Sequence, residues 1–287
     1  MKQKRSLSLI LALCLAVSVI LSGCGKKENL LALGDSITSG FSLEAPEEEC
    51  YVNLMAADKN LVAANLAASG AKSADTKALV CGGSLDKDIT SADYITLTIG
   101  GNDLSAVLYG SVAARLSEAE GTAIDWVKVK ERLLAGDLDT IAALGKTIEA
   151  LAAPEETPEK VAFSAEMDKF KANLTDIATY IKEKNPEAKL LVFTYFNPFA
   201  WITLEQIKPA AEGMDACIKA VNTVITENAA SLGYLVADAY TAFSASTENL
   251  SNAYANSFFD MKLDIHPNAA GHALMAKLAE EALFKAK

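Results

Sequence analysis

The chain has little of what metal sites and nucleic-acid sites are built from. Its 287 residues include two histidines and five cysteines, and no cysteine pair has the Cys-x-x-Cys spacing. A zinc site would have to be built mainly from carboxylates, so we expect no bound metal. The 26 basic residues are outnumbered by 37 acidic ones, and the sequence has no internal repeat and no basic stripe interleaved with aromatics. Such a body repels nucleic acid, which is therefore excluded as a partner.

The composition is that of an ordinary globular protein. Apolar residues make up 51% and charged residues 22%, which excludes a disordered or collagen-like chain. Once an N-terminal stretch is set aside, about 260 residues remain. This length favours one large α/β domain, predicted over 30–287, over two small ones.

The N-terminus predicts an exported protein. Met1–Arg5 is basic and Ser6–Leu21 is an almost unbroken apolar run, as in a secretory signal peptide. The run is short for a membrane-spanning helix, which needs roughly 20 residues. Leu21-Ser22-Gly23-Cys24 resembles the lipobox of bacterial lipoproteins, whose cysteine is diacylated and becomes the mature N-terminus.

The lipobox resemblance implies a signal peptide over 1–23, a lipid such as palmitate on Cys24 and an extracytoplasmic chain anchored to the bacterial cell membrane. The lipidated tether, 24–29, would be only a few residues long, so the first strand would begin near the bilayer. Removal of the signal peptide would leave 23 basic and 37 acidic residues, a net charge of −14.

Three cysteines remain in the predicted mature domain: Cys50, Cys81 and Cys217. An odd number cannot pair completely. Export permits a Cys50–Cys81 disulfide, and buried free thiols are the alternative that we favour.

Short apolar runs alternate with longer segments of helical spacing. This alternation predicts a parallel sheet of about five strands with helices on both faces. The segment 104–165 is too long for one crossover helix and is predicted to be a helical insertion. The expected buried strands are Leu30–Leu33, Leu61–Leu66, Tyr94–Ile99, Lys189–Tyr195 and Gly233–Ala237, and the expected helices include Met167–Lys184, Met214–Ala230 and Pro267–Lys285.

Polar motifs follow these strands, at the sheet edge where ligands bind in open parallel sheets. Gly34-Asp35-Ser36 follows the first strand and places a serine where a helix is expected to open. Ser69-Gly70 follows the second strand and Gly100-Gly101-Asn102-Asp103 follows the third. Asp264-Ile265-His266-Pro267 stands near the end of the chain. Each motif alone also fits a turn or a helix cap.

Together and in this order, the motifs resemble the four sequence blocks of the SGNH hydrolases, also called GDSL lipases or esterases. The resemblance spans Leu30–Leu283 and implies a three-layer αβα, flavodoxin-like fold. It also implies an acyl-ester hydrolase that uses no cofactor. Carried over by position, the nucleophile is Ser36 and the base is His266, and the oxyanion hole is formed by Ser36, Gly70 and Asn102.

The residues fit this chemistry. A serine hydroxyl needs a neutral imidazole to take its proton, and only His266 and His272 are available. His272 lies well inside the closing helix, whereas His266 precedes a proline that suits a first helical turn. His266 is therefore preferred. The backbone amides of Ser36 and Gly70 and the side-chain amide of Asn102 can stabilise the negative oxygen.

The acid departs from the family pattern, which places an aspartate three residues before the histidine. Leu263 occupies that position, and Asp264 stands only two residues before His266. We predict that Asp264 orients the imidazole, with Asp260 or a backbone carbonyl as alternatives. Asp35 and Asp103 are expected to hold their own turns.

The substrate is left open between lipid esters, such as lysophospholipid, and acetyl esters of carbohydrates. The insertion 104–165 and the loop 197–210, with Phe196, Phe199 and Trp201, are predicted walls of the cleft. The competing hypothesis is an envelope lipoprotein, without catalysis, that binds a glycan or lipid in the same cleft. In either case we expect a monomer.

Overall fold

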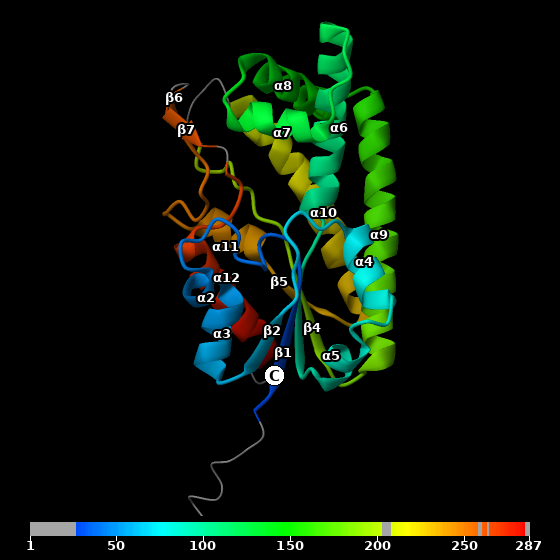
Figure 1. Ribbon diagram of the computed structural model, residues 1–287, viewed down its shortest axis with the longest axis vertical. Helices are drawn as coiled ribbons and strands as arrows, with labels where there is room; N and C mark the ends of the chain where they lie inside the picture. Colours follow the sequence, from blue (N-terminus) through cyan, green and yellow to red (C-terminus); the bar gives the residue numbers. More distant parts are fainter. Residues whose placement is uncertain (1–26, 203–207, 258–259, 263, 285–287) are drawn as a thin grey trace, which may run out of the picture.

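The computed structural model describes residues 27–202, 208–257, 260–262 and 264–284 (Figure 1). The predicted signal peptide, the lipid site at Cys24 and most of the tether lie outside the described residues. Leu263 also lies outside them.

A single five-stranded parallel sheet forms the centre of the molecule. Its strands are β1 (Asn29–Gly34), β2 (Val62–Asn65), β3 (Tyr94–Thr98), β4 (Lys189–Phe193) and β5 (Leu235–Ala237). They lie in the order β2-β1-β3-β4-β5, and every neighbouring pair is parallel. This is the flavodoxin-like order, in which the sheet winds outward in both directions from β1 and β3. The predicted fold class is confirmed.

Successive side chains of the inner strands point to opposite faces of the sheet, and both faces are buried. In β1, Leu30 and Ala32 face one core, and Leu31 and Leu33 face the other, as the twofold period of a strand requires. One helical layer contains α2 (Pro46–Glu49), α3 (Tyr51–Lys59), α11 (Ala239–Ala245) and α12 (Ala269–Phe284). The other contains α4 (Ser73–Cys81), α5 (Asp86–Ser91), α9 (Pro158–Lys184) and α10 (Lys208–Leu232).

The predicted insertion is helical and extends beyond the sheet (Figure 1). It comprises α6 (Gly101–Glu120), α7 (Trp126–Leu134), α8 (Leu138–Ala152) and the first turns of α9. Its apolar faces form a small core of their own around Val112, Leu116 and Val129. Thr157 caps α9 and Pro158 occupies its first turn, which is why the chain turns here. Within the described part, no helix is both long and apolar enough to cross a membrane.

Two local predictions are wrong. All four residues of β2 are exposed, because β2 is an edge strand that pairs only with β1. No regular helix follows Ser36 either. The chain makes a series of turns instead, because Gly40 and Ser42 have positive φ angles of 75° and 71°, which a helix does not allow.

The remaining findings concern the thiols and the C-terminal region. Cys50, Cys81 and Cys217 are free, as favoured from the sequence, although Cys81 is only partly buried. An antiparallel hairpin that was not predicted, β6 (Tyr254–Ser257) and β7 (Asp260–Lys262), leads into the Asp264–His266 segment. The closing helix α12 begins at Ala269, because Asn268 accepts a hydrogen bond from the Gly271 amide and caps it.

Candidate active site

Ser36 sits on a tight turn at the carboxyl end of β1. The turn is closed by backbone hydrogen bonds from Ser39 to Asp35 (3.1 Å) and from Phe41 to Ser36 (3.0 Å). Gly34 enters it at φ 136°, and a Cβ at this position would collide with the Thr98 carbonyl oxygen of β3. Only glycine fits here. The result is a serine that is 8% exposed at the edge of the sheet.

Asp35 stabilises this turn through hydrogen bonds. Its Oδ1 accepts hydrogen bonds from the Ile37 amide (3.0 Å) and from the Thr98 hydroxyl (2.8 Å). Burial raises the pKa of Asp35 to about 6, although the hydrogen bonds from Thr98 and Ile37 act against the rise. Asp35 therefore holds its own turn, as expected, and also ties it to β3.

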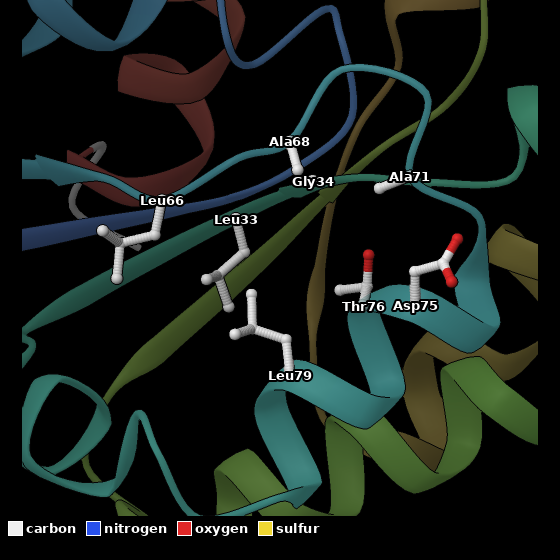
Figure 2. A pocket seen from close by; sticks show the side chains of 8 residues that line it. All are labelled: Leu33, Gly34, Leu66, Ala68, Ala71, Asp75, Thr76 and Leu79. Atoms are coloured by element: carbon white, nitrogen blue, oxygen red, sulfur yellow. The ribbon is translucent and has the colours of Figure 1, made fainter.

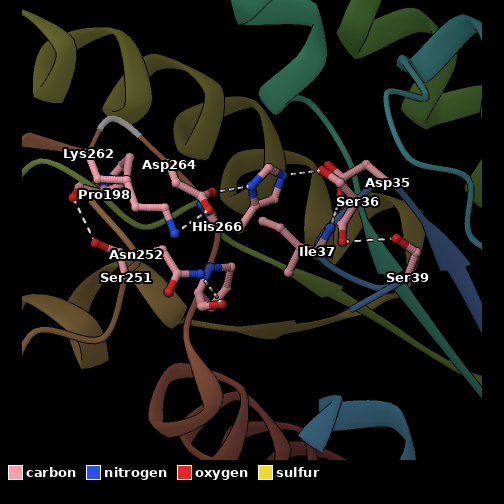
Figure 3. A network of polar contacts seen from close by, with 11 residues as sticks. Asp35, Ser36, Ile37, Ser39, Pro198, Ser251, Asn252, Lys262, Asp264 and His266 are labelled. Carbon is pink, nitrogen blue, oxygen red and sulfur yellow. Dashed lines mark hydrogen bonds and ion pairs between the residues drawn. The ribbon is translucent and has the colours of Figure 1, made fainter. Parts of the chain in front are cut away.

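His266 contacts both Ser36 and Asp264 (Figure 3). Its Nε2 lies 2.9 Å from Ser36 Oγ, and its Nδ1 lies 2.6 Å from Asp264 Oδ1. The same Oδ1 accepts the His266 backbone amide at 3.2 Å, a local aspartate turn that a spacing of two residues permits. Asp260, the alternative acid, instead accepts a hydrogen bond from Asn256. The carboxylate at the imidazole is that of Asp264.

Asp264 remains ionised in this arrangement. Burial by itself raises its pKa, but hydrogen bonds from the His266 ring, the His266 amide and the Ser42 hydroxyl outweigh burial and hold the pKa well below its usual range. Lys262 Nζ lies 3.2 Å from the second carboxylate oxygen, Oδ2. An ionised carboxylate on Nδ1 favours the tautomer in which Nε2 can accept the serine proton.

Two of the predicted oxyanion donors, Gly70 and Asn102, lie on segments that are hydrogen-bonded to each other. Gly70 follows β2 with a φ of 85°, which explains the glycine. Asn102 lies in the first turn of α6, and its side-chain amide donates to the Ala71 carbonyl at 3.0 Å. A primary amide carries two donor hydrogens, so the second is left for a substrate.

Further hydrogen bonds fix these loops beside the serine turn. The Ala68 amide donates to the Gly34 carbonyl (3.0 Å), and the Ser39 and Ser69 hydroxyls are 2.9 Å apart. Asp103 does more than hold its own turn: its carboxylate accepts both the amide and the hydroxyl of Ser73, at the start of α4. Asp103 thus joins the Asn102 turn to the segment that follows Gly70.

His272 is not part of the site. It lies fully buried in α12, where its Nδ1 accepts the Tyr51 amide at 3.3 Å. Its Nε2 has no hydrogen-bond partner among the described residues. Burial lowers the pKa of His272 to about 4, and the charge of His266 adds to this effect.

Three residues at the site carried no recognisable signal in the sequence: Phe41, Ser42 and Lys262. The Phe41 ring is 51% exposed and its centroid lies 4.8 Å from that of His266. Ser42 and Lys262 contact Asp264. Phe41 and Ser42 are separated from their partners by more than 200 positions, and Lys262 is a surface residue of a hairpin that was not predicted.

Of the three aromatics predicted to line the cleft, one is a core residue. Phe196 is 1% exposed and stacked on Phe243 with ring centroids 4.2 Å apart. Phe199 is partly buried against the core and Trp201 is half-buried.

A cavity of about 50 Å³ lies beneath the loop that carries Gly70 (Figure 2). Leu33 of β1, Leu66 and Leu79 of α4 point into it, and Ala68 and Ala71 of the loop lie above it. Neither Ser36 nor His266 lines this cavity.

Among the described residues, no group of three or more His, Cys, Asp or Glu side chains could hold a metal ion.

Comparison with known proteins gives a consistent result. The model of the GDSL-like Lipase/Acylhydrolase family matches residues 32–274. An uncharacterized Bacillus subtilis (strain 168) protein, YpmR, is 26% identical over 97% of this chain and 94% of its own length.

Solved structures share the fold at low identity. An extracellular lipase from Streptomyces rimosus superimposes with a TM-score of 0.59 at 18% identity, covering 89% of this chain and 99% of the lipase. A phospholipase A1 from Streptomyces albidoflavus NA297 gives 0.55 at 20% identity, covering 86% and 95%. A variant of Axe2, an acetyl-xylooligosaccharide esterase from Geobacillus, gives 0.52 at 17% identity, covering 91% and 96%.

Proposed function

Since this chain belongs to the GDSL-like Lipase/Acylhydrolase family, we propose that it is a serine hydrolase that cleaves carboxylic acyl esters with Ser36 as nucleophile and His266 as base. The observation that carries the proposal is the 2.9 Å contact between Ser36 Oγ and His266 Nε2, backed by Asp264 on Nδ1. A binding protein would have no need of a nucleophile aligned with a base that is itself oriented by a carboxylate.

In the first half of the reaction, Ser36 Oγ attacks the ester carbonyl while its proton passes to His266 Nε2. The carbonyl oxygen becomes negative, and the amides of Ser36, Gly70 and Asn102 are the donors proposed to stabilise it. Collapse of the tetrahedral intermediate breaks the bond to the alcohol, which takes the proton from His266 and leaves. Ser36 is then acylated.

In the second half, a water molecule gives a proton to His266 and attacks the acyl-enzyme. The second intermediate collapses with release of the carboxylic acid, and Ser36 Oγ recovers its proton. Asp264 stays ionised throughout and stabilises the imidazolium that forms twice per turnover. An oxyanion donor of this kind is typically worth about 3 to 4 kcal/mol of the barrier.

For the substrate, we propose an ester that lies outside the bilayer, such as an acetylated cell-wall carbohydrate. The related folds include lipases as well as an acetyl-xylooligosaccharide esterase, so lipid esters are the alternative. The proposed anchor at Cys24 supports the first class. Ser36 follows the carboxyl end of β1, and the chain enters from the opposite end of that strand (Figure 1), so a short tether directs the site away from the membrane.

The test uses p-nitrophenyl acetate, butyrate, octanoate and palmitate with the full-length protein in detergent. We expect turnover that is lost in Ser36→Ala and kept in Ser244→Ala, a matched control on the exposed face of α11. A fluorophosphonate should label the parent protein and not Ser36→Ala. Preference for acetate supports the carbohydrate class, and preference for palmitate supports the lipid class. If neither turnover nor labelling occurs, the proposal fails and the ligand-binding alternative is favoured.

Export and anchoring are tested separately. In a bacterial host fed radiolabelled palmitate, the parent chain should be labelled and appear in the membrane fraction. Cys24→Ala should lose the label. Labelling that persists in Cys24→Ala would contradict the proposed lipid site.

A further inference from the structure

The β6–β7 hairpin delivers a lysine to the acid of the site. Lys262, the last residue of β7, places Nζ 3.2 Å from Asp264 Oδ2 (Figure 3). This is the carboxylate oxygen that His266 does not use, since the His266 ring and amide both contact Oδ1. We propose that Lys262 is a positioning residue that fixes Asp264 against His266. This inference rests on the proposed function.

The contact differs from an ordinary surface ion pair in the burial of its acid. The Asp264 side chain is 15% exposed, and that of Lys262 is 51% exposed. Such pairs contribute little when both partners are free to move. The Oδ1 atom of Asp264 is already held by His266. A cation on Oδ2 therefore restricts rotation of the Asp264 carboxylate. The ammonium group stays in water, where it loses little hydration.

The hairpin gives Lys262 a defined direction. Its register pairs Tyr254 with Lys262 and Ala255 with Met261. Ser42 approaches the same carboxylate from the serine turn with a strained φ of 71° and donates its hydroxyl to it. Strain of this kind is kept where the surroundings fix it. The acid stands only two residues before His266, and these two donors, from separate segments, hold it in place.

The expected pH effect has a definite sign. Among the described residues, the titratable groups coupled to the charge of His266 are Asp264, Asp35 and the buried, neutral His272. Lys262 adds a positive charge on the far side of Asp264, which opposes protonation of the imidazole. Removing this charge should therefore shift the acid limb of the activity profile to higher pH by about half a unit, the order expected for one charge screened by water.

The first experiment measures kcat/KM against pH for the parent protein, Lys262→Met and Lys262→Arg. The control is Lys184→Met, which removes the lysine of a comparable lysine–aspartate pair with Asp86 at the end of α9. We expect Lys262→Met to move the acid limb to higher pH by about half a unit and to lower kcat several-fold with little change in KM. Lys262→Arg should restore both, and Lys184→Met should leave both unchanged.

The second experiment does not depend on turnover. The chain has only two histidines, so NMR can follow the His266 ring directly. The signal of His272 is identified by its loss in a His272→Asn variant. Lys262→Met should move the titration of His266 to higher pH in the parent background. In an Asp264→Asn background the effect should shrink, because the carboxylate that holds the lysine ammonium beside the site is gone.

Unchanged His266 titration in Lys262→Met would overturn the inference, even if the enzyme is active. An equal shift with and without Asp264 would also overturn it, because the lysine would then act without the acid. A shift that depends on Asp264 in a protein that does not hydrolyse esters would support the inference and contradict the proposed function.

Discussion

Two buried ionisable groups should give this protein opposite dependences of stability on pH. His272 and Asp35 are both fully buried, and burial disfavours the charged form of each. Because one is a base and the other an acid, their effects on the free energy of unfolding have opposite signs. The prediction concerns two variants, His272→Asn, which keeps an acceptor for the Tyr51 amide, and Asp35→Asn, which keeps one for Ile37 and Thr98.

For His272, the folded pKa of about 4 lies below the ordinary value of 6.5. Between these values the unfolded chain binds a proton that the folded chain does not, so stability falls as the pH falls through this window. At 1.36 kcal/mol per unit, the loss amounts to about 3 kcal/mol. His272→Asn removes this loss.

For Asp35, the folded pKa of about 6 lies above the ordinary value of 3.8. Between these values the folded chain binds the extra proton, so stability falls as the pH rises through the window, again by about 3 kcal/mol. Asp35→Asn removes the loss. In the parent protein the two slopes nearly cancel between about pH 4 and 6.

The assay is urea unfolding, followed by circular dichroism, in steps from pH 4 to pH 8. Relative to the parent, His272→Asn should gain about 3 kcal/mol as the pH falls, and Asp35→Asn should gain about the same as the pH rises. The double variant should restore a nearly flat difference. Difference curves that stay within about 1 kcal/mol over the whole range, or slopes of the same sign, would refute the reasoning.

Three further predictions concern the site. Asp264→Asn should lower kcat by about 100-fold to 10,000-fold because the imidazole loses its orienting charge, whereas Asp260→Asn, in the preceding strand β7, should leave kcat unchanged. Equal losses in steady-state assays would contradict the assigned acid. Asn102→Ala should lower kcat by about 100-fold to 1,000-fold with little change in KM, since the donor acts in the transition state; an effect confined to KM would contradict an oxyanion role. Gly34→Ala should destabilise the fold by about 2 kcal/mol or more in urea unfolding, because φ is 136° and the Thr98 carbonyl leaves no room for a methyl group; parent-like stability would contradict this account.

Local sequence signals were sufficient for the architecture. The apolar runs of β1, β3 and β4 are buried on both faces, which requires helices on both sides of a parallel sheet. The exception is β2. Its residues, Val62–Asn65, are as apolar as those of a buried strand, but whether a strand is central or at an edge depends on pairing partners that its own sequence does not specify.

Some residues of the candidate site could be predicted from the sequence and others could not. Ser36, Gly70, Asn102 and His266 could be proposed from the resemblance to the SGNH hydrolases. Their positions after predicted strands or before the closing helix agreed with it, because such positions meet at one edge of the sheet. The role of Asp103 was underestimated, because its partner Ser73 lies 30 positions away. Phe196 was expected to line the cleft, and its packing against Phe243 could not be seen in an isolated aromatic residue.

The sequence by itself determined the order of strands and helices, the family to which the chain belongs and the residue types available for nucleophile, base and oxyanion donors. These follow from periodicity and from motifs within a few residues. Only the tertiary structure decided which carboxylate meets His266, that Lys262 and Ser42 contact it, and that His272 is a buried core residue. Those outcomes depend on distances between segments far apart in the chain, which are set by packing of the whole domain.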